Sequence, residues 1–507
     1  MVLTYAEYRD KVLGCFNGKN IGGTLGAPFE CLRGVFDLDF YTQELNGDPF
    51  PNDDLDLQLV WLNAVEQYGR HIDGITLGEY WINYITPHWG EYGAGKNNLR
   101  AGIVPPLSGA LNNIYKDSCG CFILSELWAC LSPGHPEIAV KYAFEDGSVN
   151  HADEGLYAEI FCAAIQSAAF AQQDVQKLLD IGLSYIPADC GVARGVACVR
   201  KSYHAGDDWK TARKRVMQQV PGSFGAMGTR REDILPDEPV GDIGWDAPSN
   251  IAIMVIGLLY GEGDFGKSLC IAVGCGEDAD CTAGTLGALL GIMHGNKAIP
   301  NRWLEPLGGK IKTKCINLAD LGLKIPGTIA ELTDRVCRLM PVFLGQELCD
   351  TLCENGYTIM LKEPEALMCT PQPLNAWYSK NFFDRLMEAP DTVSLETPIF
   401  RMSLKYDGTP FITPGCDKKF TLIVENTIQM QQWINIRWHL PEGFTLSPNT
   451  ELSDSLEQFY CNIGINRYDF LLHVPETVKG KEELILSVSS QGHPSRGLMP
   501  IILFVNK

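Results

Sequence analysis

The hydrophobic pattern of this 507-residue chain changes its period near residue 390. Before that point, apolar residues recur every three or four positions, which is typical of helices that bury one face. One such segment, which follows His151, places on one side Tyr157, Ile160, Phe161, Ala164 and Ala168. Capping boxes predict two further helix starts, at Thr4 with Glu7 and at Thr328 with Glu331. We therefore expect the first part of the chain to be all-helical.

After residue 390, apolar and polar residues alternate along the chain, as they do in β-strands with one buried face. Short β-branched and aromatic runs, separated by turn residues, are FTLIVENT, WINIRWHL, YDFLLHVPE, EELILSVSS and MPIILFVN. Five clear runs within about 110 residues indicate an antiparallel β-sandwich of the immunoglobulin or fibronectin type. The pattern thus predicts a mostly α chain, with a compact all-helical domain at residues 1–388 and a β-sandwich at residues 389–507.

The charge balance restricts the kinds of partner. The formal net charge is −21, so the chain has no broad basic surface to neutralise the phosphates of a nucleic acid or an anionic membrane. The eighteen cysteines show no regular disulfide or zinc-ribbon spacing, and the first residues carry no secretory pattern. Reduced thiols in a cytoplasmic protein are therefore expected. Residues 281–293 are the least polar stretch, but they are too few to cross a bilayer.

Two adjacent carboxylates open one of the expected helices. Asn52, Asp53 and Asp54 precede the helical run LDLQLVWLNAVEQY, and Asp56 follows closely. Neighbouring carboxylates repel each other, and a hard divalent cation relieves this repulsion far more than a helix dipole does. The alternative is a solvated helix cap, which is the more common role of an isolated Asp-Asp pair.

A second acidic segment precedes a helix of small, nonpolar residues. Asp278 and Asp280 flank a single residue, so both can turn toward one ion as the chain enters the run AGTLGALLGIMHG. The alanines and glycines of this run allow close packing against a neighbouring helix. An ordinary acidic cap is again the competing interpretation.

Glycine recurs every four residues in a third segment, which then ends with Pro28 and Glu30. The spacing gives one helix a smooth face for close backbone contact. The glycines are Gly14, Gly18, Gly22 and Gly26.

The fourth segment contains Asn150 and His151, directly before an expected helix. A lone histidine in this position is more often a hydrogen-bonded structural residue than a ligand contact.

In order and spacing, these four segments resemble the ADP-ribosylglycohydrolase family, also called the DraG-like family. The Gly-rich first helix of the family ends in a glutamate, which is matched by Glu30. Its Thr-Asp-Asp-Thr signature corresponds to residues 52–55, its histidine segment to residues 150–151, and its late Gly-Asp-Thr-Asp-Thr signature to residues 277–281. The resemblance covers roughly residues 8–345 and excludes the β-rich part.

The resemblance implies a metal-dependent hydrolase that cleaves a glycosidic bond at a ribose-like sugar, with an ADP-ribosyl compound as the substrate class. In the family, two Mg²⁺ or Mn²⁺ ions bind the sugar hydroxyls and lower the pKa of the attacking water. The implied metal ligands are Asn52, Asp53, Asp54, Asp278, Asp280 and Thr282. The implied catalytic carboxylates are Glu30, Asp54 and Asp280, and the implied substrate contacts are His151, Asn97, Asn98 and Trp245.

This chain departs from the family at several hydroxyl-bearing positions. Leu55 replaces the second threonine of the first signature, while Ala279 and Cys281 replace both threonines of the late one. Gly23 stands where the first helix of the family has an aspartate. Cysteine is a soft ligand and a poor substitute for a hydroxyl group on Mg²⁺. The acidic positions remain, which favours metal binding, but the changed neighbours leave the identity of the sugar open.

Two other functions stay open at this point. A binuclear-metal glycosidase that acts on a small sugar or nucleoside without ADP fits the added sandwich and the lack of an evident cationic pyrophosphate cradle, although helix N-termini can also hold pyrophosphate. A non-catalytic structural or binding member of the family fits Leu55, Ala279 and Cys281. The sandwich could serve oligomerisation, cover the pocket or bind glycan.

Overall fold

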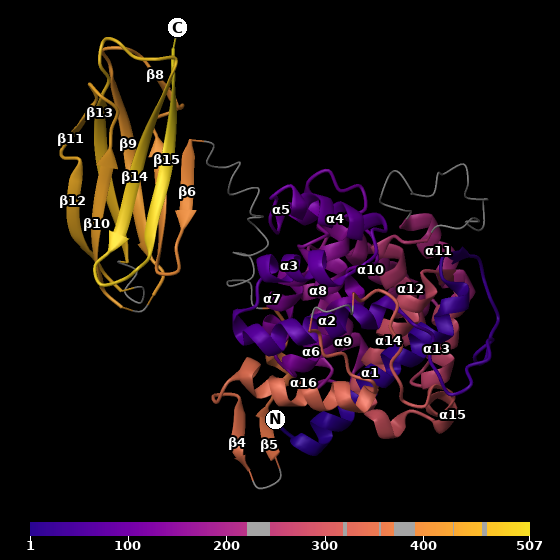
Figure 1. Cartoon of the computed structure of the whole chain (residues 1–507). Helices are drawn as coiled ribbons and strands as arrows, with labels where there is room; N and C mark the ends of the chain where they lie inside the picture. Colours follow the sequence, from indigo (N-terminus) through magenta and orange to yellow (C-terminus); the bar gives the residue numbers. More distant parts are fainter. Residues whose placement is uncertain are drawn as a thin grey trace. The chain divides into compact units, whose positions relative to one another are not determined.

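Helices make up the first part of the chain and strands the second, which confirms the predicted fold class (Figure 1). The computed structural model describes residues 1–220, 244–317, 322–353, 356–369, 391–428, 430–458 and 464–506. Two compact units, Met1–Ala376 and Trp377–Lys507, are distinguished by their internal contacts. The boundary predicted at residue 388 falls outside the described residues.

The helices of the first unit are mostly buried. Among the described residues their bounds are α1 (Tyr5–Gly26), α2 (Asp53–Tyr68), α3 (Gly74–Tyr84), α4 (Gly90–Arg100), α5 (Leu107–Ala110), α6 (Ser125–Leu131), α7 (Pro136–Gly147), α8 (Asp153–Ala168), α9 (Val175–Ser184), α10 (Gly191–His204), α11 (Trp209–Gln219), α12 (Ala247–Tyr260), α13 (Phe265–Gly274), α14 (Ala279–His294), α15 (Asn301–Leu304) and α16 (Ile329–Leu344). The capping box predicted at Thr4 and Glu7 is present at the start of α1. At α16, Thr328 accepts from the Glu331 amide, whereas the Glu331 carboxylate accepts from Gly327.

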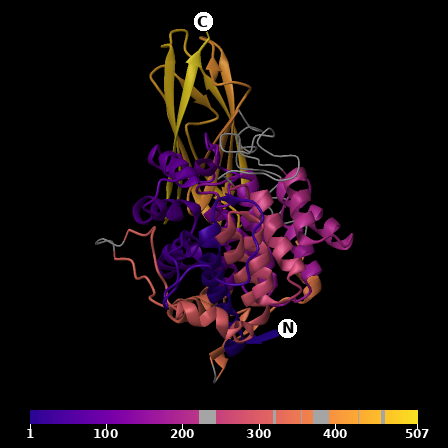
Figure 2. The same cartoon turned by 90° about the vertical axis from the view of Figure 1, so that its right-hand side faces the viewer.

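Two small sheets also belong to the helical unit. In one, β5 (Gly356–Met360) lies between β1 (Val2–Thr4) and β4 (Cys349–Cys353), so that the N-terminus is held beside the end of this unit (Figures 1 and 2). In the other, β2 (Leu32–Arg33) pairs with β3 (Gly276–Glu277). This second pairing joins the segment after α1 to the segment before α14.

The second unit is a β-sandwich of two five-stranded sheets, with the strand orders β12-β10-β14-β15-β8 and β11-β13-β9-β7-β6. Alternate residues of β10 and β15 are buried, because one face of each sheet packs into a shared apolar core. Pairing is antiparallel except between β15 and β8. The bounds are β6 (Thr392–Glu396), β7 (Phe400–Tyr406), β8 (Phe411–Ile412), β9 (Asp417–Asn426), β10 (Gln432–His439), β11 (Thr445–Ser447), β12 (Glu451–Leu456), β13 (Ile465–His473), β14 (Lys481–Ser490) and β15 (Arg496–Val505).

Among the helices that the structure describes, none combines the length and apolarity needed to cross a bilayer. The stretch at residues 281–293 lies within α14 and is buried. The cysteines whose side chains are described carry free thiols.

Candidate functional site

The glycine stripe determines how closely α1 and α14 approach each other. The two helices run antiparallel, and a methyl group placed on Gly14 would lie 2.6 Å from the carbonyl oxygen of Gly291. Methyl groups placed on Gly18, Gly22 or Gly26 would lie even closer to the backbone of α14. Only glycine permits this backbone contact. As a result, the last turn of α1 lies against the first turn of α14, and Glu30 follows directly.

The first signature meets the late signature through Asn52. Its side-chain oxygen accepts a hydrogen bond of 2.7 Å from the Asp54 amide and thereby caps α2. Its amide nitrogen donates to Oδ2 of Asp280 over 3.2 Å. Two acidic segments more than 200 residues apart in the sequence are therefore held together by one side chain.

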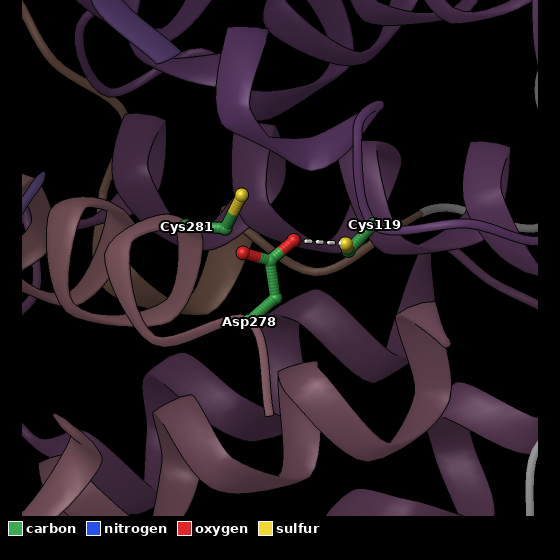
Figure 3. Close-up of side chains that lie close together, drawn as sticks. All are labelled: Cys119, Asp278 and Cys281. Atoms are coloured by element: carbon green, nitrogen blue, oxygen red, sulfur yellow. Dashed lines mark hydrogen bonds between the residues drawn. The ribbon is translucent and has the colours of Figure 1, made fainter. Parts of the chain in front are cut away.

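The carboxylates and thiols at this junction form three overlapping groups. In each group, the ligand atoms lie within 4.8 Å of one another. The groups are Glu30–Asp278–Asp280, Asp54–Asp280–Cys281 and Cys119–Asp278–Cys281, the last of which is shown in Figure 3.

Several oxygens of these groups are buried without a hydrogen-bond partner. They are Oδ1 of Asp278 and Oδ1 of Asp280, and also Oδ2 of Asp54, which has an ion-pair partner 3.5 Å away in Lys19. A buried polar atom without a partner costs roughly 1–3 kcal/mol, and more when it is charged. A divalent cation would compensate several such oxygens at once, so the residues present fit a metal site.

Lysine side chains compensate the carboxylates of the first signature. Nζ of Lys19 is buried, 3.5 Å from Oδ2 of Asp54 and 3.3 Å from Oε1 of Glu126. Burial by itself lowers the pKa of Lys19, but the negative charges of Glu126 and Asp54 outweigh it and raise that pKa. Nζ of Lys314 lies 3.3 Å from Oδ1 of Asp53.

In the late signature Glu277 is paired with Arg33 over 3.0 Å, but Asp278 and Asp280 have no such cation among the described residues. No lysine, arginine or histidine of the described part of the chain forms an ion pair with Asp278 or Asp280. Burial, followed by the charges of Asp278 and Glu30, raises the pKa of Asp280 well above its usual range. The charge that the protein leaves uncompensated is therefore concentrated at the start of α14.

Three other carboxyl groups have pKa values near neutrality. Loss of solvation at the cavity mouth, and then the charge of Asp278, raises the pKa of Glu30 to about 7. Burial raises the pKa of Asp54 to about 7 even though Lys19 opposes the shift. Burial likewise raises the pKa of Glu91 to about 7. These groups can exchange protons near physiological pH.

A cavity of about 570 Å³ opens above these groups. Its lining includes Glu30, Asp53, Asp278 and Asp280 from the sequence-predicted set, together with Trp245. The backbone oxygen of Trp245 accepts from the amide of Cys119. A second cavity of about 630 Å³ contains none of the predicted site residues, so it is not the candidate site.

Several lining residues were not identified from the sequence. Glu91 and Tyr92 open α4, and the hydroxyl group of Tyr92 donates to Oδ2 of Asp53 over 2.9 Å. The remaining ones include Trp89, Tyr115, Cys119 and Lys314. These residues come from irregular segments or helix starts with no recurring motif, so only their position in the folded chain reveals them.

Other predicted site residues lie outside the lining of this cavity. His151 is fully buried, and its ring nitrogens contact Ser118 and Asn150. Burial lowers the pKa of His151 to about 3. The Asn98 amide donates to the carbonyls of Ser108 and Leu111.

Three further predicted residues also lie outside the lining. Asn97 is exposed on α4. The hydroxyl group of Thr282 donates to the Ala279 carbonyl of its own helix. Asp54 lies beneath the lining, where it takes part in the group with Asp280 and Cys281.

Three of the solved structures that match this chain illustrate what it is similar to. One is titled "ADP-ribosylglycohydrolase-related protein complex": it is 20% identical, covers 67% of this chain and 98% of its own, and has a TM-score of 0.42. The yeast GGA1 GAE domain is 13% identical, covers 22% of this chain and 97% of its own, and has a TM-score of 0.16. Pseudomonas fluorescens alkylpurine DNA glycosylase AlkC is 12% identical, covers 69% of this chain and 99% of its own, and has a TM-score of 0.14.

Comparison with curated proteins gives no match. The sequence model named ADP-ribosylglycohydrolase matches residues 4–338, which contain the glycine stripe, both acidic signatures and the cavity described above. Since this match spans more than half of the chain, the protein belongs to the ADP-ribosylglycohydrolase family.

Proposed function

We propose that this protein is a metal-dependent hydrolase that cleaves a glycosidic bond at a ribose-like sugar. The observation that carries the proposal is the meeting of Glu30, Asp53, Asp278 and Asp280 in one cavity, although they come from three distant segments. Family membership supports a glycohydrolase-type reaction. A solvated helix cap, the alternative for each acidic segment alone, does not account for carboxylates from separate segments that line one cavity.

We assign the hard cation of this site to Glu30, Asp278 and Asp280, because an all-oxygen donor set suits Mg²⁺ or Mn²⁺. When bound, such a cation polarises the sugar oxygens and lowers the pKa of a water molecule. The family resemblance implies two cations. The second would bind among the ligand groups that contain Cys281, which are Asp54–Asp280–Cys281 and Cys119–Asp278–Cys281. Lys19 leaves Asp54 less available to it, because the ammonium group already pairs with that carboxylate.

The side chains around the cavity would bind and orient the sugar. Trp89, Tyr115 and Trp245 present aromatic surface along the wall, which suits the apolar face of a sugar or a base. Hydrolysis transfers the oxygen of water to the anomeric carbon and a proton to the leaving group. Glu91 is placed in the lining with a pKa near neutrality, so it is our candidate for moving that proton.

The charge of the cavity lining bears on the substrate class. Five carboxyl groups and a single ammonium line the cavity among the described residues. A pyrophosphate would be repelled there unless bound cations or helix N-termini offset the charge. This observation favours the second candidate, a small sugar or nucleoside without ADP, whereas family membership favours an ADP-ribosyl compound.

A substrate panel distinguishes these possibilities. Hydrolysis of ADP-ribosyl-arginine, ADP-ribosyl-serine, nucleosides and aryl glycosides would be measured with Mg²⁺ and with Mn²⁺. Asp280→Asn should abolish turnover, while Glu262→Gln, which removes one charge from an exposed position, should leave it unchanged. Turnover of ADP-ribosyl compounds alone would exclude the small-sugar alternative. If no compound is hydrolysed, the proposal fails and the non-catalytic function of the family gains support.

A further inference from the structure

The third ligand group differs from the others because it contains two thiols. Cys119 precedes α6, Cys281 lies in the first turn of α14, and the carboxylate of Asp278 lies between them (Figure 3). The Cys119 thiol donates to Oδ2 of Asp278 over 2.5 Å. The other carboxylate oxygen, Oδ1, has no hydrogen-bond partner and lies on the side of Cys281 in Figure 3.

All three side chains are buried at the base of the cavity. Their exposed fractions are 3% for Cys119, 6% for Asp278 and 7% for Cys281. The first-signature carboxylates have lysine partners, but Asp278 has none among the described residues. A buried carboxylate oxygen without a partner, beside two thiols, therefore lacks a compensating cation.

The donor types select the cation. Mg²⁺ and Mn²⁺ prefer oxygen ligands, whereas Zn²⁺ binds cysteine thiolates and carboxylates together. Catalytic zinc sites typically use three protein ligands and keep one coordination position open. Cys119, Asp278 and Cys281 supply three protein donors beside an open cavity.

We propose that Cys119, Asp278 and Cys281 bind one thiophilic divalent cation, with Zn²⁺ as the best match. Each thiol loses its proton to solvent when it becomes a ligand, as metal binding by cysteine requires. Asp278 is shared with the oxygen-only group, so the site would pair one soft cation with one hard cation. Binding of this cation can be tested without any turnover. Only a catalytic use of the cation rests on the proposed function.

The test uses the full-length protein and measures cation binding directly. Zn²⁺ stoichiometry and affinity would be determined by elemental analysis and competition titration, and Co²⁺ would be added as a spectroscopic probe. A thiolate-to-cobalt charge-transfer band in the wild type would show sulfur ligation. We expect one tightly bound Zn²⁺ per chain and such a band.

Serine variants locate the ligands. Removing a residue that merely hydrogen-bonds a metal ligand typically lowers metal affinity by about 10–100-fold. Removing a ligand itself should cost more. Cys119→Ser and Cys281→Ser should therefore each lower the Zn²⁺ affinity by at least about 100-fold and remove the cobalt band. Cys198→Ser is the matched control, because Cys198 is also 7% exposed but lies on α10, away from the cavity. Circular dichroism would verify that each variant folds.

The possible failures are distinguishable. A wild-type protein that gives no cobalt band, or serine variants that retain wild-type Zn²⁺ affinity, would overturn the thiol site. If the thiol site is absent but Mg²⁺ supports hydrolysis of the panel substrates, the proposed function stands without it. Zn²⁺ binding with the predicted variant pattern, but without hydrolysis of any substrate, supports the site and removes the proposed function.

Discussion

Replacing Gly22 with alanine should separate α1 from α14 and weaken both the fold and the cation site. A methyl group at this position would lie within 2.5 Å of three backbone atoms, the carbonyl carbon and oxygen of Ala283 and the amide nitrogen of Gly284. Real Cβ contacts essentially never fall below 3.0 Å, and the Ala283 oxygen lies at 2.1 Å, so the backbones must move apart by at least 0.9 Å, the difference between these two distances. No side-chain rotation can relieve a clash between a Cβ atom and a backbone.

The expected cost follows from this displacement. A gap of 0.5–1 Å removes about a quarter to a half of the dispersion energy of each contact across the interface. Overpacking in a close-packed interior typically costs about 1–3 kcal/mol, and this position contacts backbone rather than adaptable side chains, so we expect roughly 3 kcal/mol. The melting temperature of the helical unit should fall by roughly 6 °C.

The assay is thermal unfolding followed by circular dichroism, together with Mn²⁺ titration calorimetry. Gly327→Ala is the control, because a methyl group there has nothing within 4 Å and the residue does not adopt a positive φ. It should change stability by less than about 1 kcal/mol. If Gly22→Ala melts with the wild type and binds Mn²⁺ equally well, the two helices do not pack by backbone contact, and the reasoning that places Glu30 beside Asp278 is refuted.

Three further substitutions test the surroundings of the site. Lys19→Met leaves the buried carboxylates of Asp54 and Glu126 without a cation and should cost about 3–5 kcal/mol in denaturant unfolding, with partial recovery when Glu126→Gln is added. Glu91→Gln should lower kcat by about 100-fold or more while calorimetric cation affinity is retained, and equal loss of both would contradict a proton-transfer role. His151→Gln should make the free energy of unfolding fall less steeply as the pH is lowered. Because burial lowers the pKa of His151 from 6.5 to about 3, the unfolded chain binds the proton first, and wild-type stability should fall relative to the variant by about 1.4 kcal/mol for each pH unit below 6.5. Urea titrations between pH 8 and 5.5 check the sign, and parallel curves would exclude the buried neutral histidine.

The close packing of α1 against α14 could be predicted from the sequence, because glycine repeated every four residues gives a helix face that suits backbone contact. A stripe such as Gly14 to Gly26 must contact another backbone, and the small residues of α14 are its natural partner. The acidic signatures are recognisable because each stands at the start of a helix. In contrast, Cys119 and Lys314 reach the cavity through irregular loops, whose paths depend on tertiary packing that no local pattern encodes.

Side-chain orientation is equally hard to predict from one sequence. The ring of His151 contacts Ser118, which directly precedes the lining residue Cys119, but it does not line the cavity itself. The amide oxygen of Asn52, a predicted ligand, is engaged by the Asp54 backbone. Such choices depend on which hydrogen-bond partner is nearest after folding.

In the sandwich, too, some strands are predictable from local sequence and others depend on their neighbours. Runs with alternating apolar residues, such as those of β10 and β15, were recognised because their buried residues repeat with a period of two. The strand β12 reads ELSDSL and is largely polar, so it lacks that signal and is defined by its pairing with β10. Edge strands of this kind derive their structure from a neighbour rather than from their own composition.

The most direct test is calorimetric titration of Mn²⁺ into the wild type, Glu30→Gln and Asp280→Asn. It asks whether side chains from distant parts of the helical unit's sequence hold a common ion. Both positions belong to one ligand group. The wild type should bind, and each substitution alone should weaken that binding by at least about 10-fold with the fold intact. A wild type that takes up no divalent ion, or affinities that neither substitution changes, would contradict a shared metal centre.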